Sequence, residues 1–189
     1  NINIGTVTLQ AGTIVGDVAN DGTLTGSGTV DGKVTNTGVI DSAGTLTIAA
    51  LSNSKTVNVA SGSTLASGNV VQNSAALNVA GTLKAGVSTG PRGTIALNAG
   101  EITGAISNSG TLTGTGTLSG TLNNNGSANL AGTARTIINS GTFSLLDQGK
   151  LDVTTLTNKS GGTVTIDAGE QLTANKRKTK KETLKLSVH

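Results

Sequence analysis

The chain has 189 residues, the length of one domain, and its composition excludes an ordinary globular protein. It contains 28 Gly but only one Phe, one Pro and one His, and it has no Cys, Met, Trp or Tyr. Leu, Ile, Val and Phe together fill 46 positions, too few for a wide spherical core. They are enough for a narrow core, so the composition favours a thin, repetitive fold.

The formal charge of +3 is concentrated at one end of the chain. Residues 1–175 carry seven Lys/Arg and nine Asp/Glu, a net charge of −2, whereas residues 176–189 carry six and one, a net charge of +5. The body lacks clustered bases and aromatic rings, so we expect no nucleic-acid partner. No run of about 18 apolar residues occurs, so we expect no membrane insertion by this segment.

A short unit repeats along the chain: an apolar residue, a spacer, Asn, a small-residue turn, and then alternating apolar residues. It occurs as VANDGTL at 18–24, VTNTGVI at 34–40, LSNSKTVNV at 51–59, VVQNSAALNV at 70–79, ISNSGTL at 106–112, INSGTFSL at 138–145 and LTNKSGGTVTI at 156–166. Within two groups its asparagines recur every 15–20 residues: Asn20, Asn36, Asn53 and Asn73, then Asn108, Asn124, Asn139 and Asn158.

This period matches one rung of a coil with two or three short strands. Alternation inside each unit predicts half-buried strands. Gly and Asn suit the sharp corners, and stacked asparagines can form a hydrogen-bonded ladder. We therefore predict an all-β fold, a right-handed parallel β-solenoid over residues 1–175 with about 9–10 rungs of 15–20 residues. Six apolar positions that follow the asparagines are predicted to be buried: Val57, Val59, Leu77, Val79, Leu112 and Val164.

Two longer segments, 11–38 and 99–126, align without gaps and share 15 of 28 residues, which predicts an internal duplication. Between them, residues 84–98 depart from the repeat, and Pro91-Arg92-Gly93 is interpreted as a loop leaving one corner. The basic tail at 176–189 is interpreted as a cap or a vector-derived extension. Because the chain begins at Asn1 without a signal peptide, it is interpreted as a segment excised from a longer protein.

The units LTNKSGGTVTIDAGEQL and LSNSKTVNVASGSTL resemble the repeats of filamentous-haemagglutinin-type adhesins. GTLTGTGTLSGTLNNNG is similar to the passenger repeats of autotransporters. Both are type V secretion substrates with right-handed β-helical stalks. The resemblance covers about residues 1–174 and implies a passenger stalk segment on the bacterial cell surface or outside the cell. Its partner would be the surface, protein or glycan, of a host or neighbouring cell. The family's C-terminal outer-membrane β-barrel is absent, so the chain could only be a passenger fragment.

Little in the sequence suggests catalysis. The only histidine is His189 and there is no cysteine, which removes Cys/His chemistry, the Ser-His-Asp arrangement and most zinc sites. Four acids lie close in sequence, and some polysaccharide-degrading β-helices use such clusters: Asp147, Asp152, Asp167 and Glu170. They follow no repeated motif, so we interpret them as solvated. We expect no enzymatic activity, no cofactor and no metal site, and the sequence identifies no binding residues.

Two other functions stay open beside the adhesin. A self-assembling fibre would stack solenoids end to end. An ice-binding solenoid would use rows of Thr-x-Thr, which occurs at 6–8, 23–25, 45–47, 111–113, 155–157 and 163–165. Thr is also an ordinary outward-facing strand residue, and the triplets at 155–157 and 163–165 are too close to share one face. The adhesin is the preferred hypothesis.

Overall fold

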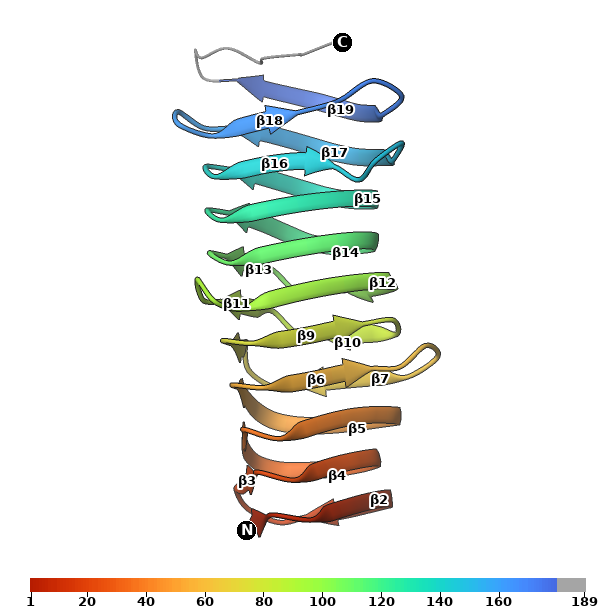
Figure 1. The fold of residues 1–189 in the computed structure, drawn as a ribbon. Coiled ribbons are helices and arrows are strands. Elements are labelled where there is room, and N and C mark those ends of the chain that lie inside the picture. Colours follow the sequence, from red (N-terminus) through yellow and green to blue (C-terminus); the bar gives the residue numbers. More distant parts are fainter. Residues whose placement is uncertain (180–189) are drawn as a thin grey trace.

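The protein forms a rod of stacked rungs in a computed structural model that describes the backbone of residues 1–179 and the side chains up to Asn175. In this range it contains strands and no helix, and every strand pairing is parallel. The rungs climb from the N-terminus at one end of the rod to β19 at the other (Figure 1). The fold is thus a parallel β-solenoid of about ten rungs of about 17 residues, as predicted. The predicted right-handedness stays a prediction.

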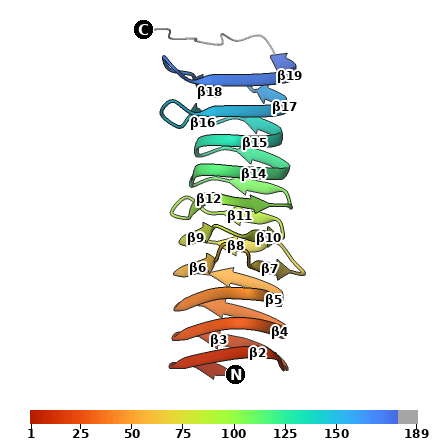
Figure 2. The same ribbon diagram turned by 90° about the vertical axis from the view of Figure 1, so that its right-hand side faces the viewer.

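Each rung contains three strand segments separated by corners. The arrangement is clearest in the middle of the rod, where β6, β7 and β8 form one rung and pair with β9, β10 and β11 of the next. We call the segment that follows the asparagine corner the first segment, and the next two the second and third. Elsewhere a longer strand continues around a corner, as in β4 and β5 (Figure 2).

The strand bounds in the N-terminal half are β1 Ile2–Asn3, β2 Thr6–Ile14, β3 Val18–Asn20, β4 Thr23–Asn36, β5 Val39–Asn53, β6 Thr56–Val59, β7 Thr64–Ser67, β8 Val71–Asn73, β9 Ala76–Val79 and β10 Thr82–Lys84. The remaining strands are β11 Val87–Thr89, β12 Thr94–Ile102, β13 Ile106–Asn108, β14 Thr111–Asn124, β15 Ser127–Asn139, β16 Thr142–Leu145, β17 Lys150–Asn158, β18 Thr163–Thr165 and β19 Gln171–Thr179.

The interior is a set of apolar columns, because alternate side chains of each strand point inward and successive rungs are in register. One column in the first segment runs through Leu24, Ile40, Val57, Leu77, Ile95, Leu112, Ala128, Phe143 and Val164. All of these side chains are buried. The single Phe143 stacks between Ala128 and Val164, so the largest side chain of the column has smaller side chains on both neighbouring rungs. The six positions predicted to be buried are all buried.

The predicted asparagine ladder occupies the corner between the third and first segments. Seven of the ladder asparagines donate through Nδ2 to the Oδ1 of the Asn one rung further on, at 2.6–2.8 Å. The same Nδ2 also donates to a backbone carbonyl of the next rung, as Asn36 does to Thr56 O at 2.9 Å. The ladder includes Asn3, which the sequence analysis did not identify, and it is interrupted at Thr89.

The two segments that align in sequence share the same backbone irregularities. Ala11 and Ala99, which are 88 residues apart, are the aligned alanines that have positive φ, at 59° and 62°. Strand pairing shifts register beside each of them. A second shift follows Val30 in one segment and the aligned Leu118 in the other. These matched irregularities support the predicted duplication, which stays a prediction.

The solenoid pairing runs past the boundary predicted at residue 175. β19 pairs with β17 through Thr179, which lies opposite Asn158 at the ladder position. The composition changes at Lys176, but parallel pairing uses backbone groups and does not depend on it. Residues 180–189 of the predicted basic tail lie outside the described residues.

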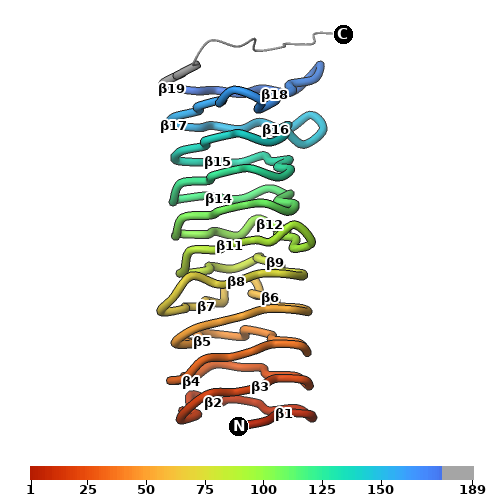
Figure 3. The backbone as a smooth tube through the Cα atoms, turned by 90° about the vertical axis from the view of Figure 1, so that its left-hand side faces the viewer, coloured from red at the N-terminus to blue at the C-terminus, as the bar shows by residue number. Residues whose placement is uncertain are grey.

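The loops lie at the corners of the rod. Pro91-Arg92-Gly93 forms a turn at the corner between β11 and β12, and the strands on both sides of it stay in register. Residues 84–98 therefore belong to a regular rung rather than departing from it. Residues 146–149, between β16 and β17, project from the rod (Figure 3).

Candidate functional site

The outer surface carries the functional groups of the rod, because the interior is apolar and closed. The outward positions of the second segment form a column that is mostly threonine. Its members are Thr45, Thr64, Thr82, Glu101, Thr117, Thr133, Asp152 and Thr173. Since each member stands on a separate rung, their spacing is about 4.8 Å along the rod axis.

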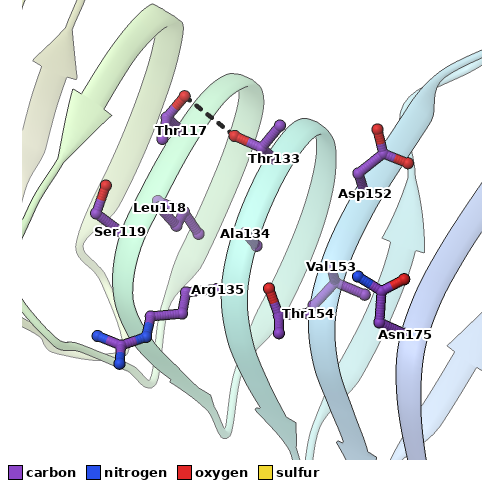
Figure 4. Close-up of a pocket in the computed structure, with 10 residues that line it drawn as sticks. All are labelled: Thr117, Leu118, Ser119, Thr133, Ala134, Arg135, Asp152, Val153, Thr154 and Asn175. Atoms are coloured by element: carbon purple, nitrogen blue, oxygen red, sulfur yellow. Dashed lines mark hydrogen bonds between the residues drawn. The ribbon is translucent and has the colours of Figure 1, made fainter.

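A shallow groove of about 400 Å³ lies beside the C-terminal part of this column (Figure 4). Thr117, Thr133 and Asp152 line one wall. The other wall is lined by Ser119, Arg135, Thr154 and Asn175, and the backbone of Leu118, Ala134 and Val153 passes between the walls. Leu118, Ala134 and Val153 belong to the inward column, so they close the groove from the interior.

Two hydrogen bonds orient hydroxyls of the groove. Thr133 Oγ1 donates to Thr117 Oγ1 at 3.2 Å, and Ser119 Oγ donates to Glu101 Oε1 at 2.6 Å. Arg135 and Asp152 are exposed, and neither side chain has a hydrogen-bond or ion-pair partner among the described residues. Figure 4 places them on opposite sides of the groove. The described side chains of the groove therefore present hydroxyls, a guanidinium and a carboxylate along the rod axis.

This set of groups can bind a polar ligand along the rod axis. Hydroxyls, a guanidinium and a carboxylate can together donate to and accept from a polyhydroxylated chain. Glycoside hydrolysis by the usual route needs two carboxyl groups that flank the same bond. Asp152 is the only carboxylate among the residues that line the groove.

The four acids considered in the sequence lie at separate places. Asp152 lies in the groove, and Asp147 lies in the turn between β16 and β17. Asp167 and Glu170 share the turn between β18 and β19, where the Asp167 backbone N–H donates to Glu170 Oε2 at 2.7 Å. Among residues 1–179, no three His, Cys, Asp or Glu side chains are grouped so that they could hold a metal ion.

The Thr-x-Thr triplets do not form one row. Those at 6–8, 23–25, 111–113 and 163–165 lie in first segments, but the triplet at 45–47 is in a second segment and that at 155–157 in a third. Among triplets in the same segment, only those at 6–8 and 23–25 lie on adjacent rungs. Further along, the same outward positions hold other residues, such as Asp41, Asn58 and Asn78, which are linked to one another by hydrogen bonds.

Of the residues that line the groove, the sequence alone pointed only to Asp152. Their signal is the repeated small-Gly-Thr corner, found at 11–13, 43–45, 80–82, 115–117 and 131–133, which begins the second segment. Counting from this corner would have aligned Glu101 with the threonines, because 99–101 has the same pattern. It would not have aligned Asp152, since Leu151 and not a glycine lies opposite Gly132. The register shifts beside the corners conceal that alignment in a simple periodic reading.

Comparison with protein-family models, with curated proteins and with solved structures finds no match. The structure contains no helix, in the part of the chain that it describes, with the length and apolar character needed to cross a bilayer.

Proposed function

We propose that this solenoid is a stalk segment of an extracellular bacterial surface adhesin, which attaches a cell to a host or neighbouring cell. The proposal rests on one observation above all: a rod with an apolar interior displays a regular, polar, hydroxyl-rich outer surface. Ten rungs at about 4.8 Å give a rod of roughly 45 Å, which holds contact groups away from the surface that bears it. The resemblance to type V secreted passengers agrees with this role.

The contact surface in this proposal is the groove beside Asp152 and Arg135. Each contact of a hydroxyl with a glycan or peptide is weak, but the contacts repeat from rung to rung. Many copies on one cell would add the weak contacts by multivalency. The guanidinium of Arg135 and the carboxylate of Asp152, both exposed, supply the stronger, charge-assisted hydrogen bonds.

The test is a glycan array and a cell-binding assay with the wild-type protein, followed by two double variants. Arg135→Ala with Asp152→Asn removes the groove charges. Lys159→Ala with Asp147→Asn is the matched control, since those side chains are exposed at other corners. We expect the groove variant to weaken binding at least tenfold, because hydrogen bonds to charged groups contribute about 1.5–3 kcal/mol each. The control variant should bind like the wild type.

Two results would count against the proposal. If the wild type binds no glycan and no cell surface, the adhesin function is wrong. If both double variants bind equally well, the rod is an adhesin but the groove is not its contact surface. Polysaccharide cleavage that is lost in Asp152→Asn would instead show an enzyme.

A further inference from the structure

The asparagine ladder is two ladders, separated by one rung. Asn3 to Asn73 form the first, with four Asn–Asn bonds, and Asn108 to Asn158 form the second, with three. Thr89 occupies the ladder position between them, opposite Asn73 on one side and Asn108 on the other. Its side chain is too short to continue the ladder.

The interruption leaves buried polar atoms without partners. Thr89 is 2% exposed and Asn108 is fully buried. Thr89 Oγ1 and Asn108 Oδ1 have no hydrogen-bond partner, and Asn73 Nδ2 retains its bond to Thr94 O but has no Asn to bind. An unsatisfied buried polar group costs roughly as much as a lost hydrogen bond. Between Asn3 and Asn158, the rung of Thr89 is therefore the one that no Asn–Asn bond joins to its neighbours.

The backbone is also least continuous near this rung. The six strands from β6 to β11 are three or four residues long. On either side of this stretch, β4, β5, β14 and β15 have 13 to 15 residues each and continue around corners. A shorter strand has fewer consecutive backbone hydrogen bonds to the neighbouring rung. Local opening of such a strand therefore breaks fewer backbone hydrogen bonds at once.

We propose that the rung of Thr89 is a seam at which the rod opens first, so that the solenoid behaves as two stable halves joined by a weaker middle. In a stack where each rung contacts only its neighbours, the free energy of unfolding is approximately the sum of the stabilities of the single rungs and of the interfaces between adjacent rungs. The interfaces of the Thr89 rung lack the Asn–Asn bonds that the flanking interfaces have. A pull along the rod, or mild denaturant, separates the halves there before either half unfolds.

The corner after Thr89 can accommodate an asparagine at the ladder position. The missing Asn–Asn bonds therefore follow from the identity of residue 89 and not from the loop at 90–93. Four residues, 90–93, connect Thr89 to Thr94. Asn158 is followed by a corner of the same length, 159–162, and still takes part in the ladder. Its Nδ2 donates to Gly162 O across that corner at 2.7 Å. Thr89→Asn should thus join the two ladders without a change in the backbone.

Native-state hydrogen exchange tests the seam. The amides of Gly90 and Ser109 are the probes, since they donate to Asn73 O and Thr89 O on the two sides of the rung. The amides of Thr37 and Ser140, which donate to Asn20 O and Asn124 O, are the equivalent probes within the two halves. In the wild type, we expect the two seam amides to exchange faster than the two reference amides.

Thr89→Asn should slow exchange of the seam amides roughly tenfold or more, since two buried hydrogen bonds are gained. The control is Thr35→Asn, the same substitution at an exposed outward position next to ladder residue Asn36, which should change nothing. Asn36→Thr is the converse variant, and it should create fast exchange at Thr37.

Three results would overturn the proposal: equal exchange of all four amides in the wild type, unchanged or faster exchange of the seam amides in Thr89→Asn, or no effect of Asn36→Thr.

Discussion

Replacing Leu112 with Asp tests the assigned register of the rod. Leu112 lies in β14, fully buried between Ile95 of the preceding rung and Ala128 of the following one. Its neighbour Thr111 is exposed and points to the opposite side of the same strand. The same substitution at these two adjacent positions should have very different effects, because only one of the side chains faces the core.

The magnitude follows from what Leu112 contacts. Removal of a buried Leu side chain typically costs about 2–5 kcal/mol, counting both transfer and the cavity that remains. The carboxyl group of Asp would find only apolar column neighbours, which adds about 1–3 kcal/mol for an unsatisfied polar group. The sum, about 3–8 kcal/mol, is a large part of the 5–15 kcal/mol that stabilises a typical protein. Thr111→Asp should change stability by less than about 0.5 kcal/mol.

Chemical denaturation followed by circular dichroism at the β-sheet band measures both variants. We expect Leu112→Asp to lose most of the transition, or to shift its midpoint strongly to lower denaturant, while Thr111→Asp unfolds like the wild type. Equal midpoints for the two variants, or a larger effect of Thr111→Asp, would show that the inward and outward positions of β14 are assigned wrongly.

Three further predictions concern the corners, the ladder and the end of the rod. Gly114→Ala should destabilise the protein by about 2 kcal/mol or more in thermal melting. The φ angle of Gly114 is +119°, and a Cβ there would clash with the carbonyl oxygen of Leu97. Gly12→Ala is the control and should be nearly neutral, because the space around Gly12 is open. Asn124→Ala should cost about 2–4 kcal/mol by denaturant titration, because it removes bonds of 2.8 Å to Asn139 and to Thr142 O and leaves Asn108 Nδ2 without its Asn partner. Deletion of residues 175–189 should lower the melting temperature more than deletion of 180–189, because the second half of β19 pairs with 155–158; equal melting of both truncations would contradict that assignment.

The sequence predicted the fold because its signals are local and repeated. Asn at 15–20-residue intervals marks the corner, and the alternation that follows, as in 56–59, marks which side chains face inward. Both features depend on residues within one rung, so no long-range information was needed. The same reasoning predicted the ladder, since equivalent corners of a solenoid must stack.

Features that depend on register between rungs were harder to predict. Thr89 belongs to the ladder, but the missing Asn concealed it, and 84–98 was interpreted as a departure from the repeat. The groove was missed because Arg135 and Asp152 are 17 residues apart and come together only through the pairing of β15 with β17. The boundary at 175 was placed by composition, while β19 continues to Thr179 by backbone pairing.

Successive rungs stack in parallel and in register around an apolar interior, and methyl–methyl nuclear Overhauser effects test this arrangement most directly. In protein with labelled methyl groups, Leu112 should show strong cross-peaks to Ile95 and to Ala128, its partners one rung before and one rung after. Phe143 ring protons should likewise show cross-peaks to Ala128 and Val164. Cross-peaks typical of antiparallel hairpins between consecutive strands, in place of these, would contradict the solenoid and everything inferred from it.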